Sequence, residues 1–343
     1  MGRRMSQSGR PYKGALEVHL EPRGKTMGRN RVFRICFGGL AGFAAFTTPL
    51  AAQDGGAWRL APESDLSAML DCFEAAGQTL ISAHRGGPTP GLPENAIPTM
   101  DALLAAHPAI MEVDVAQSAD GVHFLLHDDR LDRTTTGTGE AEAQDWASLS
   151  QLKLKDNWGW VTPYAIPTLA EALAWAKGRT VMQIDFKRSA DFGKVVAEIR
   201  RAGMANSVIL IAYSVEQAAA LHRAAPEMLL SVSIDEVGDV AALKAAGIPE
   251  HRMVAFTGTR LPRPELYREL DKADIEVIFG TLGRPPRSID AVIDRYGMDE
   301  RYAELGREGV DILATDRPRE AATALAEAGR LPKAGQCGVS RGS

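Results

Sequence analysis

Cysteine is scarce in this sequence, and clusters of cysteine and histidine are missing. The 343 residues include three cysteines: Cys36, Cys72 and Cys337. No Cys/His cluster therefore indicates a zinc site. Cys72 and Cys337 can pair in an oxidising compartment, but Cys337 lies in a polar tail, so we expect no structural disulfide.

Internal repeats, low-complexity blocks and a glycine-rich dinucleotide motif are also missing. No G-x-G-x-x-G follows the first strand-like segment, which weakens a dinucleotide-binding interpretation. The composition is that of a globular protein, with 45% hydrophobic and 24% charged residues. This balance argues against wholesale disorder and provides enough apolar residues for a large core.

The N-terminal segment has the pattern of an export signal. Residues 27–34 are basic, residues 35–46 are uncharged, and small residues follow up to Ala52. The apolar part is too short to span a bilayer comfortably, so we predict a signal peptide at 27–52 and not a membrane anchor; the alternative is a buried helix. Residues 1–26 then precede the true start, and the mature protein is periplasmic or secreted.

The rest of the chain is acidic. Residues 1–52 hold nine of the 39 Lys and Arg and two of the 44 Asp and Glu, which leaves 30 basic against 42 acidic residues. The mature protein thus has a net charge of −12. Such a charge disfavours nucleic acid or an anionic membrane surface as a partner, and we expect a small-molecule substrate and no membrane span in the mature protein.

From Leu80 onward, short apolar runs alternate with helical, alanine-rich stretches. Eight runs read as strands: Leu80–His84, Ile110–Val115, Val181–Phe186, Val208–Tyr213, Leu229–Ile234, Met253–Phe256, Glu276–Phe279 and Ile312–Thr315. This alternation predicts an α/β protein with a (β/α)₈ TIM barrel at 53–330; a doubly wound open sheet is the alternative. Residues 331–343 are polar and are predicted to form a disordered tail.

The alternation is interrupted once, between the second and third strands. Ala119-Asp120-Gly121 predicts a turn that joins the second strand to Val122–Leu126 as a hairpin. Residues 133–167 then have weak periodicity and contain Trp158 and Trp160. We predict a small insertion that passes over the mouth of the barrel.

Carboxylates lie at the ends of two strands. Glu112 and Asp114 are two residues apart on one strand, so their side chains leave the same face. Buried carboxylates side by side need a cation or a proton, which indicates metal binding or acid/base chemistry. Asp185 and Lys187 repeat the spacing on the next strand, where a plain ion pair is an equal interpretation. Three converging carboxylates suit Mg²⁺ or Ca²⁺ better than Zn²⁺.

Two histidines follow apolar strands near these carboxylates. His84 ends the first strand and His127 ends the hairpin. A single histidine at such a place is more often structural, but two of them fit a general acid and a general base around a phosphoryl or acyl group. Arg85 and Lys187 supply fixed positive charge for an anionic substrate.

These residues lie within motifs that together resemble the glycerophosphodiester phosphodiesterase family. The resemblance covers Leu80 to Pro318, and the ordered set is specific although each motif alone is weak. The motifs are His84-Arg85-Gly86, Pro93-Glu94-Asn95, Glu112-Val113-Asp114, Asp120-Gly121 to His127-Asp128, Leu131-Asp132-Arg133-Thr134-Thr135, Ile166-Pro167-Thr168-Leu169 and Thr315-Asp316-Arg317-Pro318.

The resemblance implies a barrel enzyme that hydrolyses glycerophosphodiesters to glycerol 3-phosphate and an alcohol with one divalent cation, Mg²⁺ or Ca²⁺. Residue by residue, it implies acid/base roles for His84 and His127, metal ligation by Glu112, Asp114 and Asp185, and phosphate contacts from Arg85 and Lys187. Attack by the neighbouring glycerol hydroxyl and attack by water both remain open.

The sequence departs from the family pattern at two places in the expected site. The third ligand is usually glutamate, whereas this chain has the shorter Asp185, and the seventh strand lacks a frequent tryptophan. Two alternative functions keep the same fold: a barrel phospholipase, of C or D type, that cleaves intact phospholipids, and a non-catalytic binding protein. The two histidines beside the carboxylates favour an enzyme, because binding alone needs no paired proton-transfer groups.

Overall fold

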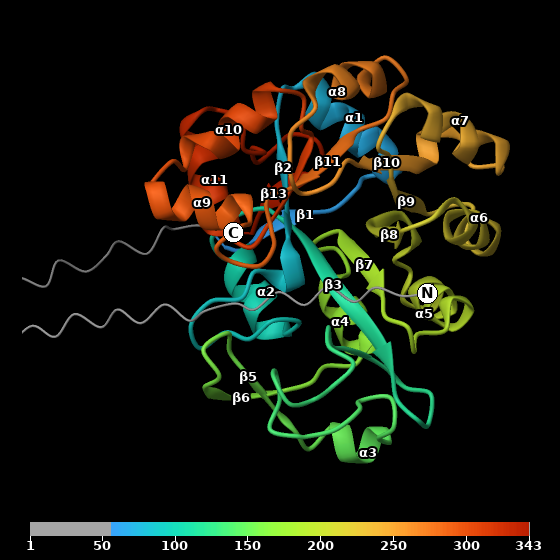
Figure 1. Cartoon of the computed structure of the whole chain (residues 1–343), viewed down its shortest axis with the longest axis vertical. Helices are drawn as coiled ribbons and strands as arrows, with labels where there is room; N and C mark the ends of the chain where they lie inside the picture. Colours follow the sequence, from blue (N-terminus) through green and yellow to red (C-terminus); the bar gives the residue numbers. More distant parts are fainter. Residues whose placement is uncertain (1–55, 343) are drawn as a thin grey trace, which may run out of the picture. The chain divides into compact units, whose positions relative to one another are not determined.

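The computed structural model describes residues 56–342 of the chain (Figure 1). The predicted upstream extension at 1–26 and the predicted signal peptide at 27–52 lie outside the described residues. None of the helices within 56–342 has the length and apolar character needed to cross a membrane.

Eight parallel strands close into a barrel. The strands are β2 (Leu80–Ala83), β3 (Ile110–Gln117), β7 (Met182–Phe186), β8 (Val208–Ala212), β9 (Leu229–Ser233), β10 (Met253–Phe256), β11 (Val277–Gly280) and β12 (Ile312–Thr315). Each pairs with the next around the ring, and β12 pairs with β2, which also pairs with β3. The closed ring confirms the predicted TIM barrel and rules out the open sheet.

Helices surround the strands (Figure 1). They are α2 (Ile97–Leu104), α4 (Leu169–Ala176), α5 (Phe192–Ala202), α6 (Val215–Ala224), α7 (Val237–Ala245), α8 (Pro264–Asp271), α9 (Ile289–Tyr296), α10 (Glu300–Arg307) and α11 (Pro318–Glu327). Side chains cap several of them; Thr168 and Glu171 form a capping box at the start of α4. Such caps satisfy the free N–H groups of the first turn.

The two-residue period of the strands sorts their side chains between two cores. Residues that point outward, such as Ile81 and Val113, pack against the helices. Residues of the other phase, such as Leu80 and Ile110, fill the lower barrel as a separate apolar cluster. Further along β3 the inward positions become polar, since Ile110 is followed by Glu112 and Asp114. The functional groups therefore face the C-terminal end of the barrel, where this fold carries its active sites.

The predicted insertion lies between β3 and β7. β4 (His123–Leu125) pairs antiparallel with the end of β3, which confirms the hairpin. The short helix α3 (Trp146–Leu149) and the antiparallel pair β5 (Lys153–Lys155) and β6 (Val161–Ala165) follow. Phe124, Leu131 and Leu154 belong to an apolar cluster that gives the insertion its own small core.

The two ends of the described chain are joined to each other. β1 (Trp58–Leu60) pairs antiparallel with β13 (Val339–Arg341), and Arg341 lies over the Trp58 ring. Helix α1 (Leu66–Ala75) carries Cys72, which forms a disulfide with Cys337.

Two predictions about this end of the chain are wrong. The expectation of no structural disulfide fails because the Cα atoms of Cys72 and Cys337 lie 5.6 Å apart, at bonding geometry. The disordered tail predicted at 331–343 fails over the described residues 331–342, which contain β13. The tail is polar, but its partners lie some 280 residues earlier in the chain, as in the pairing of Trp58 with Arg341, and local composition does not reveal them.

Candidate active site

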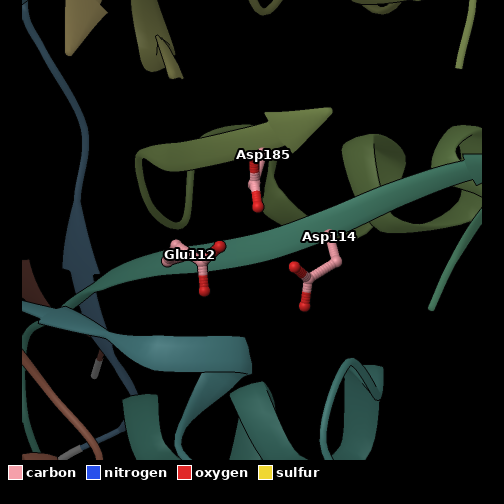
Figure 2. Close-up of side chains that lie close together, drawn as sticks. All are labelled: Glu112, Asp114 and Asp185. Atoms are coloured by element: carbon pink, nitrogen blue, oxygen red, sulfur yellow. The ribbon is translucent and has the colours of Figure 1, made fainter. Parts of the chain in front are cut away.

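Three carboxylates from neighbouring strands converge at the C-terminal end of the barrel. Asp114 of β3 pairs in register with Asp185 of β7, and Glu112 lies one inward position earlier on β3. One ligand atom from each lies within 4.8 Å of the others, and all three side chains are buried (Figure 2). The predicted convergence of the three carboxylates is therefore present.

The electrostatics of this cluster favour a cation. Burial and the charge of Asp114 raise the pKa of Glu112 to about 8. Burial also acts to raise the pKa of Asp114, but the positive charges of Lys187, His127 and Arg85 outweigh it and lower that pKa. The Oδ1 atom of Asp185 is buried without a hydrogen-bond partner. Hard oxygen ligands, crowded negative charge and an unpartnered oxygen fit Mg²⁺ or Ca²⁺.

Lys187 lies directly beside the carboxylate cluster. Its Nζ atom lies 2.7 Å from Asp114 Oδ1 and 2.8 Å from Asp185 Oδ2. The ion pair considered for Asp185 and Lys187 is thus present and extends to Asp114. Since the ammonium group also lines the large cavity above the cluster, its charge faces the space that a substrate would occupy.

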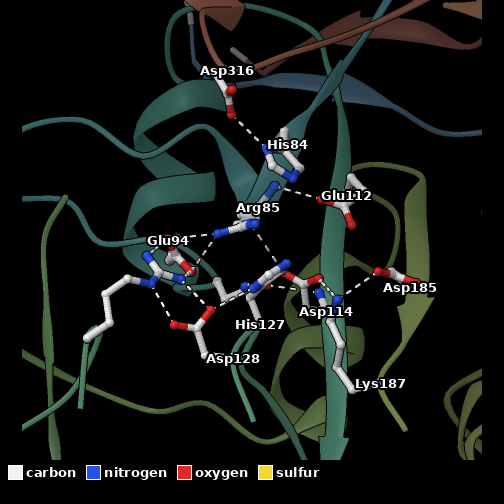
Figure 3. Close-up of polar contacts among 12 residues, drawn as sticks. His84, Arg85, Glu94, Glu112, Asp114, His127, Asp128, Asp185, Lys187 and Asp316 are labelled. Carbon is white, nitrogen blue, oxygen red and sulfur yellow. Dashed lines mark hydrogen bonds and ion pairs between the residues drawn. The ribbon is translucent and has the colours of Figure 1, made fainter. Parts of the chain in front are cut away.

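Each of the two histidines pairs with an aspartate (Figure 3). His84 Nδ1 lies 2.6 Å from Asp316 Oδ1, and His127 Nδ1 lies 2.7 Å from Asp128 Oδ1. A carboxylate only accepts hydrogen bonds, so each Nδ1 carries the proton and each Nε2 is left for other partners. Both rings line the same cavity as the carboxylate cluster.

The two aspartates differ in how their charge is balanced. Arg133 donates from Nε to Asp128 Oδ2 at 2.6 Å and from Nη2 to Asp128 Oδ1 at 2.8 Å. These bonds lower the pKa of Asp128. Among residues 56–342, no arginine forms an ion pair with Asp316: its oxygens accept from His84 and from the N–H of Gly283, at 3.0 Å. The aspartate that pairs with His84 therefore lacks the arginine partner that Asp128 has.

The pKa of His84 follows from this environment. Burial lowers it, but the hydrogen bond to Asp316 and the negative charges of Glu112 and Asp316 raise it by more. The net shift is upward, so the ring holds a proton to a higher pH than an exposed histidine does.

The segment after His84 is built to approach the carboxylate cluster. Residues His84–Gly86 form a single 3₁₀ turn, η1, in which Arg85 has a φ of 52°. The N–H of Arg85 donates to Glu112 Oε2 at 2.8 Å. Gly86 also has a positive φ, and a Cβ there would lie 2.6 Å from Met100 Cγ, so the position requires glycine.

The Arg85 guanidinium lies between two carboxylates. Nη1 donates to both oxygens of Glu94 at 3.1 and 3.2 Å, and Nε lies 3.7 Å from Asp114 Oδ2. Glu94 also accepts from Arg133. Glu94 therefore braces the loop after His84.

Sequence reasoning gave no role to three residues that hold the site together. Asp316 orients His84, and Arg133 links Glu94 to Asp128. Asn95 donates from Nδ2 to Asp114 Oδ2 at 2.7 Å and accepts from the N–H of Asp114 at 3.0 Å. All three lie in motifs quoted above, but the motifs alone do not show which side chains meet.

A cavity of about 1400 Å³ opens above the carboxylate cluster. All seven predicted site residues line it, as do Trp158 of the insertion and Tyr213 after β8. Where the family often has a tryptophan, the wall after β11 is formed by Leu282, Gly283 and Arg284. The loop after β11 and the insertion therefore both contribute to the wall of the cavity.

This barrel, with its acidic cluster and paired histidines, can be compared with known proteins. The model of the glycerophosphoryl diester phosphodiesterase family matches residues 84–320, more than half of the chain. The chain belongs to this family. The match spans η1 to the start of α11, so it contains every element that carries a predicted site residue.

Solved structures of other proteins resemble the chain over most of its length. A glycerophosphoryl diester phosphodiesterase from Parabacteroides distasonis is 29% identical, with a TM-score of 0.70 over 81% of this chain and 96% of its own. A glycerophosphodiester phosphodiesterase from Agrobacterium tumefaciens is 26% identical, with a TM-score of 0.57 over 71% of this chain and 99% of its own.

A third structure shares the fold at lower identity. It is an Oleispira antarctica phosphodiesterase in complex with the product sn-glycerol-3-phosphate, 17% identical, with a TM-score of 0.56 over 74% of this chain and 98% of its own. Together with the family match, these likenesses confirm the predicted family and fold. The chain is an enzyme of the glycerophosphodiester phosphodiesterase class.

Proposed function

We propose that this enzyme hydrolyses glycerophosphodiesters to glycerol 3-phosphate and an alcohol, with a divalent cation held by Glu112, Asp114 and Asp185. The observation that carries the proposal is one cavity in which a buried three-carboxylate cluster lies beside two Asp-paired histidines. A phosphodiester needs charge neutralisation at phosphorus and proton transfer at two oxygens, and this arrangement has groups for both.

The histidines divide the proton transfers between them. We assign His84 as the general acid, because Asp316 and Glu112 stabilise its protonated form. His127 is the general base, because Arg133 shares the charge of its partner Asp128. His127 Nε2 takes the proton of the attacking water or glycerol hydroxyl as its oxygen bonds to phosphorus, and His84 Nε2 gives a proton to the leaving oxygen as its bond to phosphorus breaks. Where the glycerol hydroxyl attacks, water then opens the cyclic phosphate to give glycerol 3-phosphate.

The cationic residues bind and orient the phosphate. Arg85 and Lys187 lie beside the carboxylate cluster and face the cavity, where their charges attract the phosphate oxygens. A bound Mg²⁺ or Ca²⁺ would add charge neutralisation at the non-bridging oxygens. Asn95 and the N–H of Arg85 fix the orientations of Asp114 and Glu112, which preserves the ligand geometry.

The histidine roles can be tested with single substitutions. We expect wild-type protein to release glycerol 3-phosphate from glycerophosphocholine, and His84→Ala and His127→Ala each to lower kcat by about 100-fold or more. His251→Ala changes an exposed histidine outside the cavity and serves as the control. Near-normal rates in both active-site variants would refute the acid/base assignment.

We further propose that the enzyme works outside the cytoplasm. The disulfide between Cys72 and Cys337 supports this, because disulfides persist mainly in oxidising compartments. The basic and apolar pattern of residues 27–52 points the same way. Mass spectrometry of the protein from its natural host should find a mature end near residue 53 and an oxidised Cys72–Cys337 peptide. A mature end upstream of Met27, or free thiols, would contradict export.

A further inference from the structure

The cations that line the cavity fall into a paired and an unpaired group. The paired ones each have a carboxylate partner: Arg85, Arg133, Lys187 and Arg317. Arg284 and Arg295 also line this cavity, and among residues 56–342 the side chain of neither forms an ion pair or a hydrogen bond. In a chain so rich in acidic residues, two cations on one cavity without acidic partners point to an external anion.

The loop that carries Arg284 is tied to the proposed acid. The N–H of Gly283, one residue before Arg284, donates to Asp316 Oδ2, and Asp316 Oδ1 pairs with His84. At its other end the loop joins α9, where Ser288 Oγ accepts from the N–H of Ala291 at 3.3 Å. The backbone at Arg284 is thus held on the side of the site where His84 and Asp316 lie.

Arg295 is in the last turn of α9 and faces the same cavity. The acid next to it does not neutralise it, because Asp294 pairs with Arg317 Nη2 at 3.1 Å. Arg317 also pairs with Asp299 at 2.8 Å. The ion pairs of this region are therefore satisfied among themselves, and the charge of Arg295 remains available.

An aromatic side chain borders the same space. Asp156 Oδ1 accepts from the N–H groups of Trp158 and Trp160 at 3.0 and 2.9 Å, and Oδ2 accepts from the N–H of Gly91 at 2.8 Å. These bonds fix the β5–β6 turn, yet the Trp158 residue is 72% exposed. An exposed indole carried on this fixed turn offers contact area to a molecule in the cavity.

We propose that the enzyme prefers glycerophosphodiesters whose leaving alcohol carries an anionic group, a carboxylate or a phosphate, which Arg284 and Arg295 bind. This inference rests on the proposed function. If His84 protonates the leaving oxygen from Nε2, that oxygen lies in the cavity on the ring edge away from Asp316, and the rest of the alcohol extends into the space that Arg284 and Arg295 line. Arginine forks bind carboxylates and phosphates through paired, charge-assisted hydrogen bonds.

The test uses three substrates that differ only at the far end of the leaving alcohol. Glycerophosphoglycerol ends in a neutral hydroxyl, glycerophosphoglycerate ends in a carboxylate, and glycerophosphoglycerol phosphate ends in a phosphate. We expect wild-type kcat/KM to be at least about tenfold higher for an anionic substrate than for the neutral one. The two anionic substrates distinguish a carboxylate from a phosphate preference.

The variants assign the preference to the two arginines. In the double variant Arg284→Gln/Arg295→Gln, the ratio of anionic to neutral kcat/KM should fall toward one. The matched control is Arg287→Gln, which removes an exposed arginine from the same loop that does not line the cavity; its ratio should equal that of the wild type. Melting temperatures of both variants check that the fold is retained.

The outcomes separate this inference from the function on which it rests. Equal wild-type kcat/KM for all three substrates, or a preference that survives the double substitution, would overturn the anionic subsite while leaving the phosphodiesterase in place. Failure of the wild-type enzyme to cleave any of the three would overturn the proposed function itself.

Discussion

The pairing of each histidine with an aspartate is the residue-scale feature on which the mechanism depends. Each aspartate accepts a hydrogen bond from Nδ1 of its histidine. Asp128 also pairs with Arg133, whereas Asp316 pairs with no arginine among the described residues. The proposed roles therefore give the same residue type opposite tasks at two positions. Burial acts to lower the pKa of His84, but Asp316 and Glu112 raise it by more, which suits a general acid.

Replacing Asp316 by Asn tests this difference. In the folded wild type the pKa of His84 is raised, so the acid form persists to a higher pH. Asp316→Asn removes the negative charge, so we expect the alkaline limb of the pH profile of kcat/KM to move to lower pH, with kcat reduced about 100-fold. Steady-state rates between pH 5 and 9 measure both effects. An unchanged alkaline limb would contradict the assignment of His84.

At the scale of elements, the strands could be predicted from the sequence, whereas the side-chain contacts that hold the site residues in place could not. Period-two patterns such as Ile110, Glu112 and Asp114 reveal which side chains share the inner face, and the eight strands follow from them. Glu112, Asp114 and Asp185 line one cavity for that reason, whereas Arg85 reaches it from the η1 turn. The contacts of Asn95 with Asp114 and of Asp316 with His84 join separate elements, and no local pattern encodes such pairs.

Glu276, the residue just before β11, has a buried carboxyl group at the end of the barrel opposite the site. Burial raises the pKa of Glu276 to about 9, and the neighbouring charges of Asp71 and Asp311 act in the same direction. The folded-state pKa lies above the unfolded value. Glu276 therefore makes its full contribution to the stability of the fold below its unfolded-state pKa, and this contribution is lost as the pH rises toward 9.

Glu276→Gln should remove this loss, because glutamine stays neutral. We expect the variant and the wild type to have similar melting temperatures near pH 4.5. Above that pH the variant should gain relative stability of up to about 1.4 kcal/mol per pH unit. Thermal unfolding at several pH values measures the difference. A constant difference between the two proteins would show that folding does not shift the pKa of Glu276, which would contradict the raised value.

At the scale of the whole molecule, the closing elements and the site lie at opposite ends of the barrel. The disulfide and the β1–β13 pair join the two ends of the described chain, and the N–H of Leu60 donates to the carbonyl of Arg179 just before β7. The disulfide and the β1–β13 pair lie outside the residues 84–320 that match the family.

The central claim is that a divalent cation in the Glu112, Asp114 and Asp185 cluster is needed for hydrolysis. The most direct measurement is the rate of glycerol 3-phosphate release by protein stripped with a chelator, before and after Mg²⁺ or Ca²⁺ is restored. The account predicts loss of activity on stripping, recovery in the wild type, and no comparable recovery in Asp114→Asn. Full activity of the stripped wild-type enzyme, with no response to added cation, would contradict it.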